Sequence, residues 1–197
     1  MTPYAKKYLR NALFEHSITV LKAGETRTLA SGKVIGEGDY YADLRLLTTL
    51  PEALKVLSET ITEMLPPNTR YLGAVPTGGM TTLGAVGSTV IDFDYDLADT
   101  LKLFYIRPEK KGHGEGKQVE GWLGTDGRAV LFEDVATSGG SMVRAIQAAR
   151  AEVPGCNLTH AICILDREMG AQQALAAIGV ELMPIFTATQ LGLKKAA

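Results

Sequence analysis

Short apolar runs alternate with segments of helical periodicity along most of the chain. Five runs have the length and composition of buried strands, at residues 71–75, 101–106, 129–132, 161–165 and 181–185. Helical patterns lie near residues 79–90, 140–152 and 168–178. This alternation predicts an α/β fold, a mainly parallel sheet flanked by helices that are reached through right-handed crossovers. Ligands of such sheets bind at the carboxyl ends of the strands.

The N-terminal part of the chain carries two further helical patterns. Tyr4, Tyr8 and Ala12 recur at helical spacing, and a second helix is expected to begin at Pro51. This second helix should stop at the two prolines at 66 and 67. With 197 residues and no internal repeat, the chain is expected to form one domain over residues 1–197.

Two carboxylates and a glycine-containing loop follow the third apolar run. The run is expected to end at Glu133 and Asp134, and a helical pattern begins after Ser141. The first N–H groups of a helix lack helical partners and lie at its positive end, so this loop suits an anion. Thr137, Ser138 and Ser141 add hydroxyl donors. A carboxylate pair would repel a phosphate but accepts hydrogen bonds from ribose hydroxyls, so the pattern indicates a sugar phosphate.

Strand, glycine loop and helix also occur in α/β proteins that bind no phosphate. The chain contains neither a P-loop nor a dinucleotide-binding glycine motif. A general nucleotide-binding fold would not explain the acidic pair.

The segment 108–121, which we term the lid segment, alternates charges with glycines. It has little apolar area to offset the entropy lost on ordering, so we expect it to move. A mobile surface hairpin is one interpretation. The segment also carries three lysines and His113, and a basic loop that closes over a polyanion and excludes water is the other.

Composition narrows the class of protein. A net charge of −2 argues against a nucleic-acid-binding protein that relies on a broad basic surface. Cys156 and Cys163 form neither a disulfide framework nor a metal site on their own. We expect no secretory signal, and no apolar run in this sequence is long enough to span a membrane. We therefore expect a cytoplasmic protein with neither nucleic acid nor membrane as partner.

The stretch 133–141 resembles the 5-phosphoribosyl-1-pyrophosphate (PRPP) signature of the type I phosphoribosyltransferases. The resemblance implies that the two acids contact the ribose hydroxyls and that the loop holds the 5′-phosphate. Together with three residues in and beside the lid segment, it assigns PRPP binding to Arg107, Lys111, His113, Glu133, Asp134, Val135, Ala136, Thr137, Ser138, Gly139, Gly140 and Ser141.

Four other segments resemble the orotate phosphoribosyltransferases in the same chain order. They are Leu29–Lys33 with Tyr40–Arg45, Pro76–Gly79, the run from Arg107 to Gly116, and Asp166–Glu168. The resemblance implies a small N-terminal hood, formed by about residues 1–50 plus the C-terminal segment. It also implies that Lys111 and His113 are catalytic.

In the same family an arginine holds orotate, and the resemblance therefore assigns orotate binding to Thr137, Arg167 and Tyr41. From the residues alone, a salt bridge at the end of its strand is the favoured interpretation of Arg167, and Tyr41 is equally able to serve packing. Pro108 stands where the family often has lysine, and Lys110 is the nearest candidate for the missing charge. Ala30 likewise replaces a lysine of some members.

The resemblance implies transfer of the phosphoribosyl group from PRPP to orotate, a pentosyltransferase reaction of pyrimidine (UMP) biosynthesis. Mg²⁺ is the expected cofactor, carried by PRPP rather than bound directly by the protein. The expected assembly is a homodimer in which the lid segment acts in trans. Two alternatives stay open, a phosphoribosyltransferase for another base and a PRPP-binding regulator without catalysis.

Overall fold

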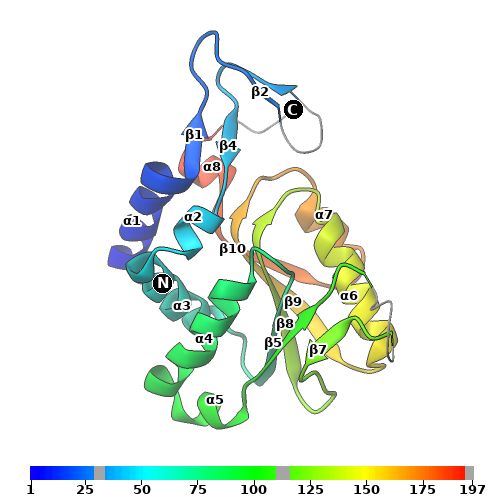
Figure 1. Ribbon diagram of the computed structural model, residues 1–197. Coiled ribbons are helices and arrows are strands. Elements are labelled where there is room, and N and C mark those ends of the chain that lie inside the picture. Colours follow the sequence, from blue (N-terminus) through cyan, green and yellow to red (C-terminus); the bar gives the residue numbers. More distant parts are fainter. Residues whose placement is uncertain (29–33, 110–115, 194–197) are drawn as a thin grey trace.

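A six-stranded sheet forms the centre of the protein (Figure 1). The computed structural model describes residues 1–28, 34–109 and 116–193. The strand order is β10-β9-β8-β5-β6-β7, and every neighbouring pair is parallel except β6 and β7. The strands are β5 (Thr69–Ala74), β6 (Lys102–Ile106), β7 (Val119–Gly121), β8 (Arg128–Ala136), β9 (Asn157–Asp166) and β10 (Glu181–Thr187). The expected mainly parallel sheet is confirmed.

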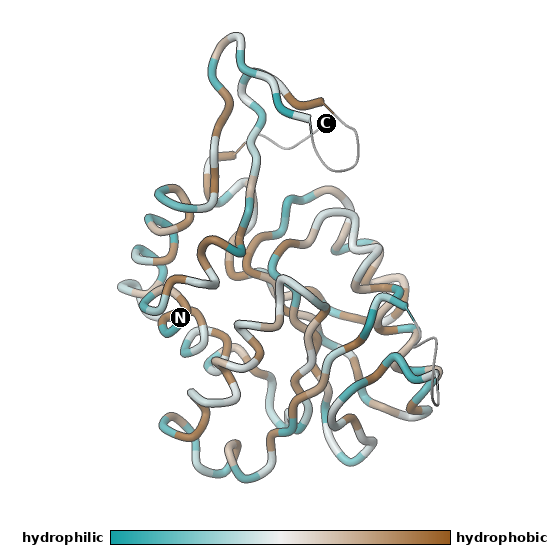
Figure 2. The backbone as a smooth tube through the Cα atoms, in the orientation of Figure 1, coloured by the Kyte–Doolittle hydropathy of each residue, from teal (hydrophilic) through white to brown (hydrophobic). Residues whose placement is uncertain are grey.

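Helices cover both faces of this sheet (Figure 1). One face packs against α1 (Pro3–Ala12), α3 (Pro51–Met64), α4 (Met80–Phe93) and α5 (Tyr95–Thr100). The other face packs against α6 (Gly140–Glu152) and α7 (Ala171–Ala176). Because side chains alternate along a strand, Val130 and Phe132 belong to the first layer, whereas Ala129 and Leu131 belong to the second. Figure 2 shows hydrophobic stretches running through the central strands.

Prolines and a threonine set the ends of the N-terminal helices. The Thr2 hydroxyl accepts a hydrogen bond from the Ala5 N–H at 3.1 Å, which caps α1, and Pro3 occupies its first position. Pro51 occupies the first turn of α3, and the helix ends before Pro66. Both helices expected from the sequence are present. None of the helices within the described ranges has the length and apolar character needed to cross a membrane.

A small projection stands above one end of the sheet (Figure 1). After α1 the chain passes through a π-helical turn, η1 (Leu13–Ser17), into β1 (Ile18–Val20), which pairs antiparallel with β4 (Tyr40–Ala42). A second pair consists of β2 (Arg27–Thr28) and β3 (Val34–Ile35). The short helices α2 (Arg45–Thr48) and α8 (Ala188–Leu191) lie near its base. We refer to the segment from β1 to β4 as the hood.

The strand β8 is longer than expected. It continues through the acidic pair to Ala136, because Val135 and Ala136 still pair with Leu165 and Asp166 of β9. The expectation that the strand ends at the two acids was therefore wrong. Because successive side chains of a strand point to opposite faces, Glu133 and Asp134 point to opposite sides of the sheet.

Candidate active site

A glycine turn connects β8 to α6 at the carboxyl edge of the sheet. Gly139 has φ +78°, and a Cβ at this position would lie 3.0 Å from the Cα of Ala171. Conformation and close approach therefore both require glycine here. Gly140 opens α6, and no described side chain caps its N-terminus. The first-turn N–H groups of a thirteen-residue helix are thus left for an anion.

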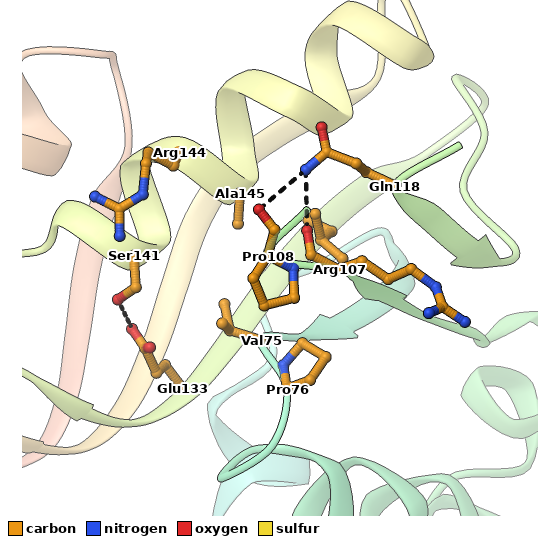
Figure 3. Close-up of a pocket in the computed structure, with 10 residues that line it drawn as sticks. Val75, Pro76, Arg107, Pro108, Gln118, Glu133, Ser141, Arg144 and Ala145 are labelled. Carbon is orange, nitrogen blue, oxygen red and sulfur yellow. Dashed lines mark hydrogen bonds between the residues drawn. The ribbon is translucent and has the colours of Figure 1, made fainter. Parts of the chain in front are cut away.

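Glu133 points to the α6 side of the sheet. The Ser141 hydroxyl donates a hydrogen bond to its Oε2 at 2.8 Å (Figure 3). Burial raises the pKa of Glu133 to about 7, and the nearby Asp134 charge adds to this rise. The Ser141 hydrogen bond and the charge of Arg144 oppose it. Near neutral pH this carboxyl exchanges readily between its two protonation states.

Asp134 lies against the loop that follows β5. A Cβ on Gly78 would overlap the Asp134 carboxylate, so this loop approaches the acid as closely as a glycine permits. The Val135 N–H donates to Oδ1 of Asp134 at 2.9 Å. Burial raises the pKa of Asp134, while Arg45 at the base of the hood lowers it. The two acids therefore lie on opposite sides of one strand, Glu133 next to α6 and Asp134 next to the loop after β5.

A pocket of about 180 Å³ opens beside Glu133 (Figure 3). The ends of β5, β6 and β8 contribute to it, together with the first turns of α6. Its lining consists of Val75, Pro76, Ile106, Arg107, Pro108, Gln118, Glu133, Ser141, Arg144 and Ala145. Three predicted PRPP-binding residues, Arg107, Glu133 and Ser141, thus border one cavity.

Arg107 lies at the rim of the pocket with its guanidinium turned away from Glu133 (Figure 3). Its Nε donates to Oε1 of Glu120 at 2.9 Å, in an ion pair across the two ends of the lid segment. The predicted catalytic residues Lys111 and His113 lie outside the described residues, as do Lys110 and the segment 29–33 of the hood.

The stem of the lid segment is tied to the end of α6. Oε2 of Glu152 accepts hydrogen bonds from the N–H groups of Gln118, at 2.8 Å, and Val119, at 3.3 Å. The Gln118 side chain donates to the carbonyl oxygen of Arg107 at 3.0 Å. The sequence did not point to Glu152, because a single acid at the end of a helix does not indicate which backbone N–H groups it will bind.

Arg167 follows β9 and reaches the hood. Its N–H donates to the Ala136 carbonyl at 2.9 Å, so it lies beside Thr137 at the same sheet edge. Its Nε donates to the Tyr40 hydroxyl at 3.2 Å, and its guanidinium lies 4.8 Å from the centre of that ring. Burial raises the pKa of Tyr40, although the Arg167 charge opposes this.

Tyr41 points to the other face of β4. Its ring lies 3.6 Å from the guanidinium carbon of Arg27. The structure thus brings Thr137 and Arg167 together and adds Tyr40, which sequence reasoning did not select over its neighbour. The alternation of β4 would have separated the two tyrosines, had the strand been recognised. A role of Tyr41 toward orotate stays a prediction.

The remaining members of the predicted PRPP set occupy the turn and the strand end. Val135 and Thr137 are half-buried, Ala136 is buried, and Ser138 is exposed at the mouth of the turn. Within the described ranges, no three His, Cys, Asp or Glu side chains are grouped to hold a metal ion. The oxygen ligands nearest the site are the carboxylates of Glu133 and Asp134.

Comparison with known proteins identifies this arrangement. No family model matches the chain. The structure is similar to that of Mycobacterium tuberculosis orotate phosphoribosyltransferase in complex with PRPP, with a TM-score of 0.71, 23% identity, and coverage of 96% of this chain and 99% of that chain. The fold is therefore that of a phosphoribosyltransferase.

Sequence relatives specify the family. The chain is 35% identical over 178 residues to orotate phosphoribosyltransferase from Rhodopirellula baltica, covering 88% of this chain and 89% of the relative. It is 34% identical over 190 residues to the enzyme of the same name from Methanosphaera stadtmanae, covering 96% and 97%. The chain belongs to the orotate phosphoribosyltransferase family.

Proposed function

We propose that the protein transfers the 5-phosphoribosyl group from PRPP to orotate, giving orotidine 5′-monophosphate and pyrophosphate in pyrimidine (UMP) biosynthesis. One observation carries the proposal. A carboxylate pair, an uncapped helix N-terminus and an arginine held by a tyrosine converge on a single edge of the sheet. The first two suit a ribose and its phosphate, and the third suits a carboxylated base. The cytoplasm is the proposed compartment.

The chemistry takes place at the anomeric carbon of the ribose. This carbon becomes electron-poor as negative charge grows on the departing pyrophosphate, so fixed positive charge near that group lowers the barrier. We assign this task to Arg107, Lys111 and His113, with Lys111 or His113 as the proton donor. Arg107 would give up its ion pair with Glu120 and bind the pyrophosphate, which is also an anion.

When bound together with PRPP, Mg²⁺ would supply positive charge that neutralises the pyrophosphate. The carboxylates of Glu133 and Asp134 fit such an ion, because Mg²⁺ prefers oxygen ligands. Their own task is to accept hydrogen bonds from the ribose hydroxyls. The half-buried position of both acids makes these hydrogen bonds stronger than in open water.

Orotate recognition rests on Arg167. A guanidinium meets a planar carboxylate through two parallel hydrogen bonds, and the contact with Tyr40 limits the orientations that Arg167 can take. Thr137 lies beside it, and Tyr41 is the third proposed contact. Purines and uracil lack the carboxylate, so the same arginine would favour orotate over those bases.

The first test is the absorbance decrease of orotate on mixing protein, PRPP and Mg²⁺, with hypoxanthine and uracil assayed in parallel. Orotate consumption that requires both PRPP and the metal is the expected result. Consumption of another base would move the proposal to that base. PRPP binding without consumption of any base would favour a regulator, for which Pro108 and Ala30 would be the relevant departures.

We further propose a homodimer in which each lid segment completes the partner's site. Subunits carrying Lys111→Ala and subunits carrying Arg167→Ala should each have strongly reduced activity alone when orotate is kept well below the KM of the Arg167→Ala variant. After mixing and subunit exchange, activity should return, because one site of the mixed dimer then has both residues. Failure to recover activity in a verified mixed dimer would contradict the trans arrangement while leaving the reaction unaffected.

A further inference from the structure

Arg144 is a positively charged residue beside the candidate site, and the reaction proposed above gives it no role. It lies in the first half of α6 and is exposed, and its guanidinium stands above Ser141 in Figure 3. Its Nη1 lies 3.3 Å from the point that a Cβ on Gly140 would occupy. The Ser138 hydroxyl lies 3.7 Å from the same point. Both groups therefore overlie the first residue of the helix.

Helix geometry explains this position. Side chains tilt toward the N-terminus of a helix, and residues four apart share one face. Arg144 therefore projects back over Gly140 toward the turn. A side chain at 140 would press against the guanidinium, so glycine leaves room for the arginine as well as for a ligand at the N–H groups.

The charge of Arg144 is available to a ligand. No ion pair joins its guanidinium to a carboxylate among the described residues. Glu133 is close enough to feel its charge, but the hydrogen bond of that carboxylate comes from Ser141. Burial also raises the pKa of Glu133 to about 7, so the nearest acid offers only partial neutralisation.

We propose that Arg144 binds the 5′-phosphate of the phosphoribosyl substrate, as a side-chain counterpart to the N–H groups of the turn. The inference rests on the proposed function insofar as that function places a phosphoribosyl group in this turn. A planar guanidinium contacts two phosphate oxygens at once. The contact persists in substrate, transition state and nucleotide product, so it adds affinity and leaves the chemical step unchanged.

The test compares Arg144→Gln with wild type in calorimetric titrations with ribose 5-phosphate and, separately, with pyrophosphate and Mg²⁺. Arg144→Gln should weaken ribose 5-phosphate binding by about 10- to 100-fold, the usual effect of losing one charged hydrogen-bonding group. Pyrophosphate binding should change less than about twofold, because that group is bound elsewhere. In turnover, KM for PRPP should rise while kcat stays the same.

Two further variants sharpen the result. Arg144→Lys keeps the charge without the planar fork and should recover part of the ribose 5-phosphate affinity. Lys55→Gln removes an exposed charge from α3 and should leave both ligands unaffected. Urea unfolding of each variant identifies any loss that comes from the fold.

The outcomes separate the two proposals. Unchanged ribose 5-phosphate binding in Arg144→Gln, an equal loss for both ligands, or no binding of ribose 5-phosphate to wild type would overturn the role of Arg144. A selective loss for ribose 5-phosphate supports it even if wild type consumes no orotate, in which case the proposed function alone fails.

Discussion

Glu133→Gln should make the protein more stable at alkaline pH while impairing PRPP binding. The substitution removes an ionisable group from the half-buried end of β8 and keeps the side-chain length. The amide oxygen still accepts the hydrogen bond that the Ser141 hydroxyl donates at 2.8 Å in the wild type. The main change is therefore the loss of the negative charge.

The magnitude follows from the pKa of Glu133, which burial raises from 4.5 to about 7. Between these values the folded protein holds a proton that the unfolded chain has released, so stability falls as pH rises through this range. Above pH 7 the ionised carboxylate costs the folded state about 3 kcal/mol relative to a neutral group. At pH 5, only slightly above the unfolded pKa of 4.5, about a quarter of this cost is present, close to 1 kcal/mol.

Urea unfolding at pH 5 and pH 8 measures the effect. Glu133→Gln should be more stable than wild type by about 1 kcal/mol at pH 5 and by about 3 kcal/mol at pH 8, so the difference should grow by about 2–3 kcal/mol between the two pH values. Glu37→Gln, which neutralises an exposed acid of the hood, is the matched control and should shift neither curve. PRPP binding measured on the same samples should weaken, because stability gained at a binding site commonly lowers function.

The reasoning is refuted if Glu133→Gln shows the pH dependence of wild type. That result would mean that the carboxylate stays ionised at pH 5 without cost, through solvent access or a compensating cation. A variant that is less stable than wild type at both pH values would instead show that the interaction with Ser141 requires the charge.

Lys111→Ala should reduce turnover by about 10²- to 10³-fold without moving the urea midpoint, and near-full activity would contradict its catalytic role. Arg167→Ala should raise the KM for orotate by about tenfold or more while the Kd for PRPP stays constant, and a parallel loss of PRPP binding would indicate a structural role. Gly78→Ala should lower PRPP affinity by about tenfold, because its Cβ would displace the Asp134 carboxylate. Gly84→Ala, in the open on α4, is its control and should leave affinity unchanged.

The parallel strands could be predicted because they are buried on both faces and therefore read as continuous apolar runs. Val130 and Leu131 point to opposite layers, yet both are apolar and fully buried. The end of β8 could not be predicted in this way. Glu133 and Asp134 read as a loop, and only pairing with the ten-residue β9 shows that the strand continues.

The hood strands escape prediction for a related reason. Each has two or three residues, too few for a periodicity, and their pairing joins distant positions such as Thr19 and Tyr41. The glycine turn between β8 and α6 could be predicted because its residues are neighbours in sequence. Tyr40 was not, since its contact with Arg167 joins positions that are 127 residues apart.

The helix α6 begins at the glycine turn after β8 and ends at Glu152, whose carboxylate accepts hydrogen bonds from the stem of the lid segment. Thirteen residues make a rod of about 20 Å, stiffened by its own hydrogen bonds and packed along the sheet. A helix of this kind moves largely as a rigid body along its axis. We therefore expect a displacement of its first turn to reach the hydrogen bonds that the N–H groups of Gln118 and Val119 donate to Glu152 at its far end. The position of the glycine turn and that of the lid stem are therefore expected to be coupled through α6.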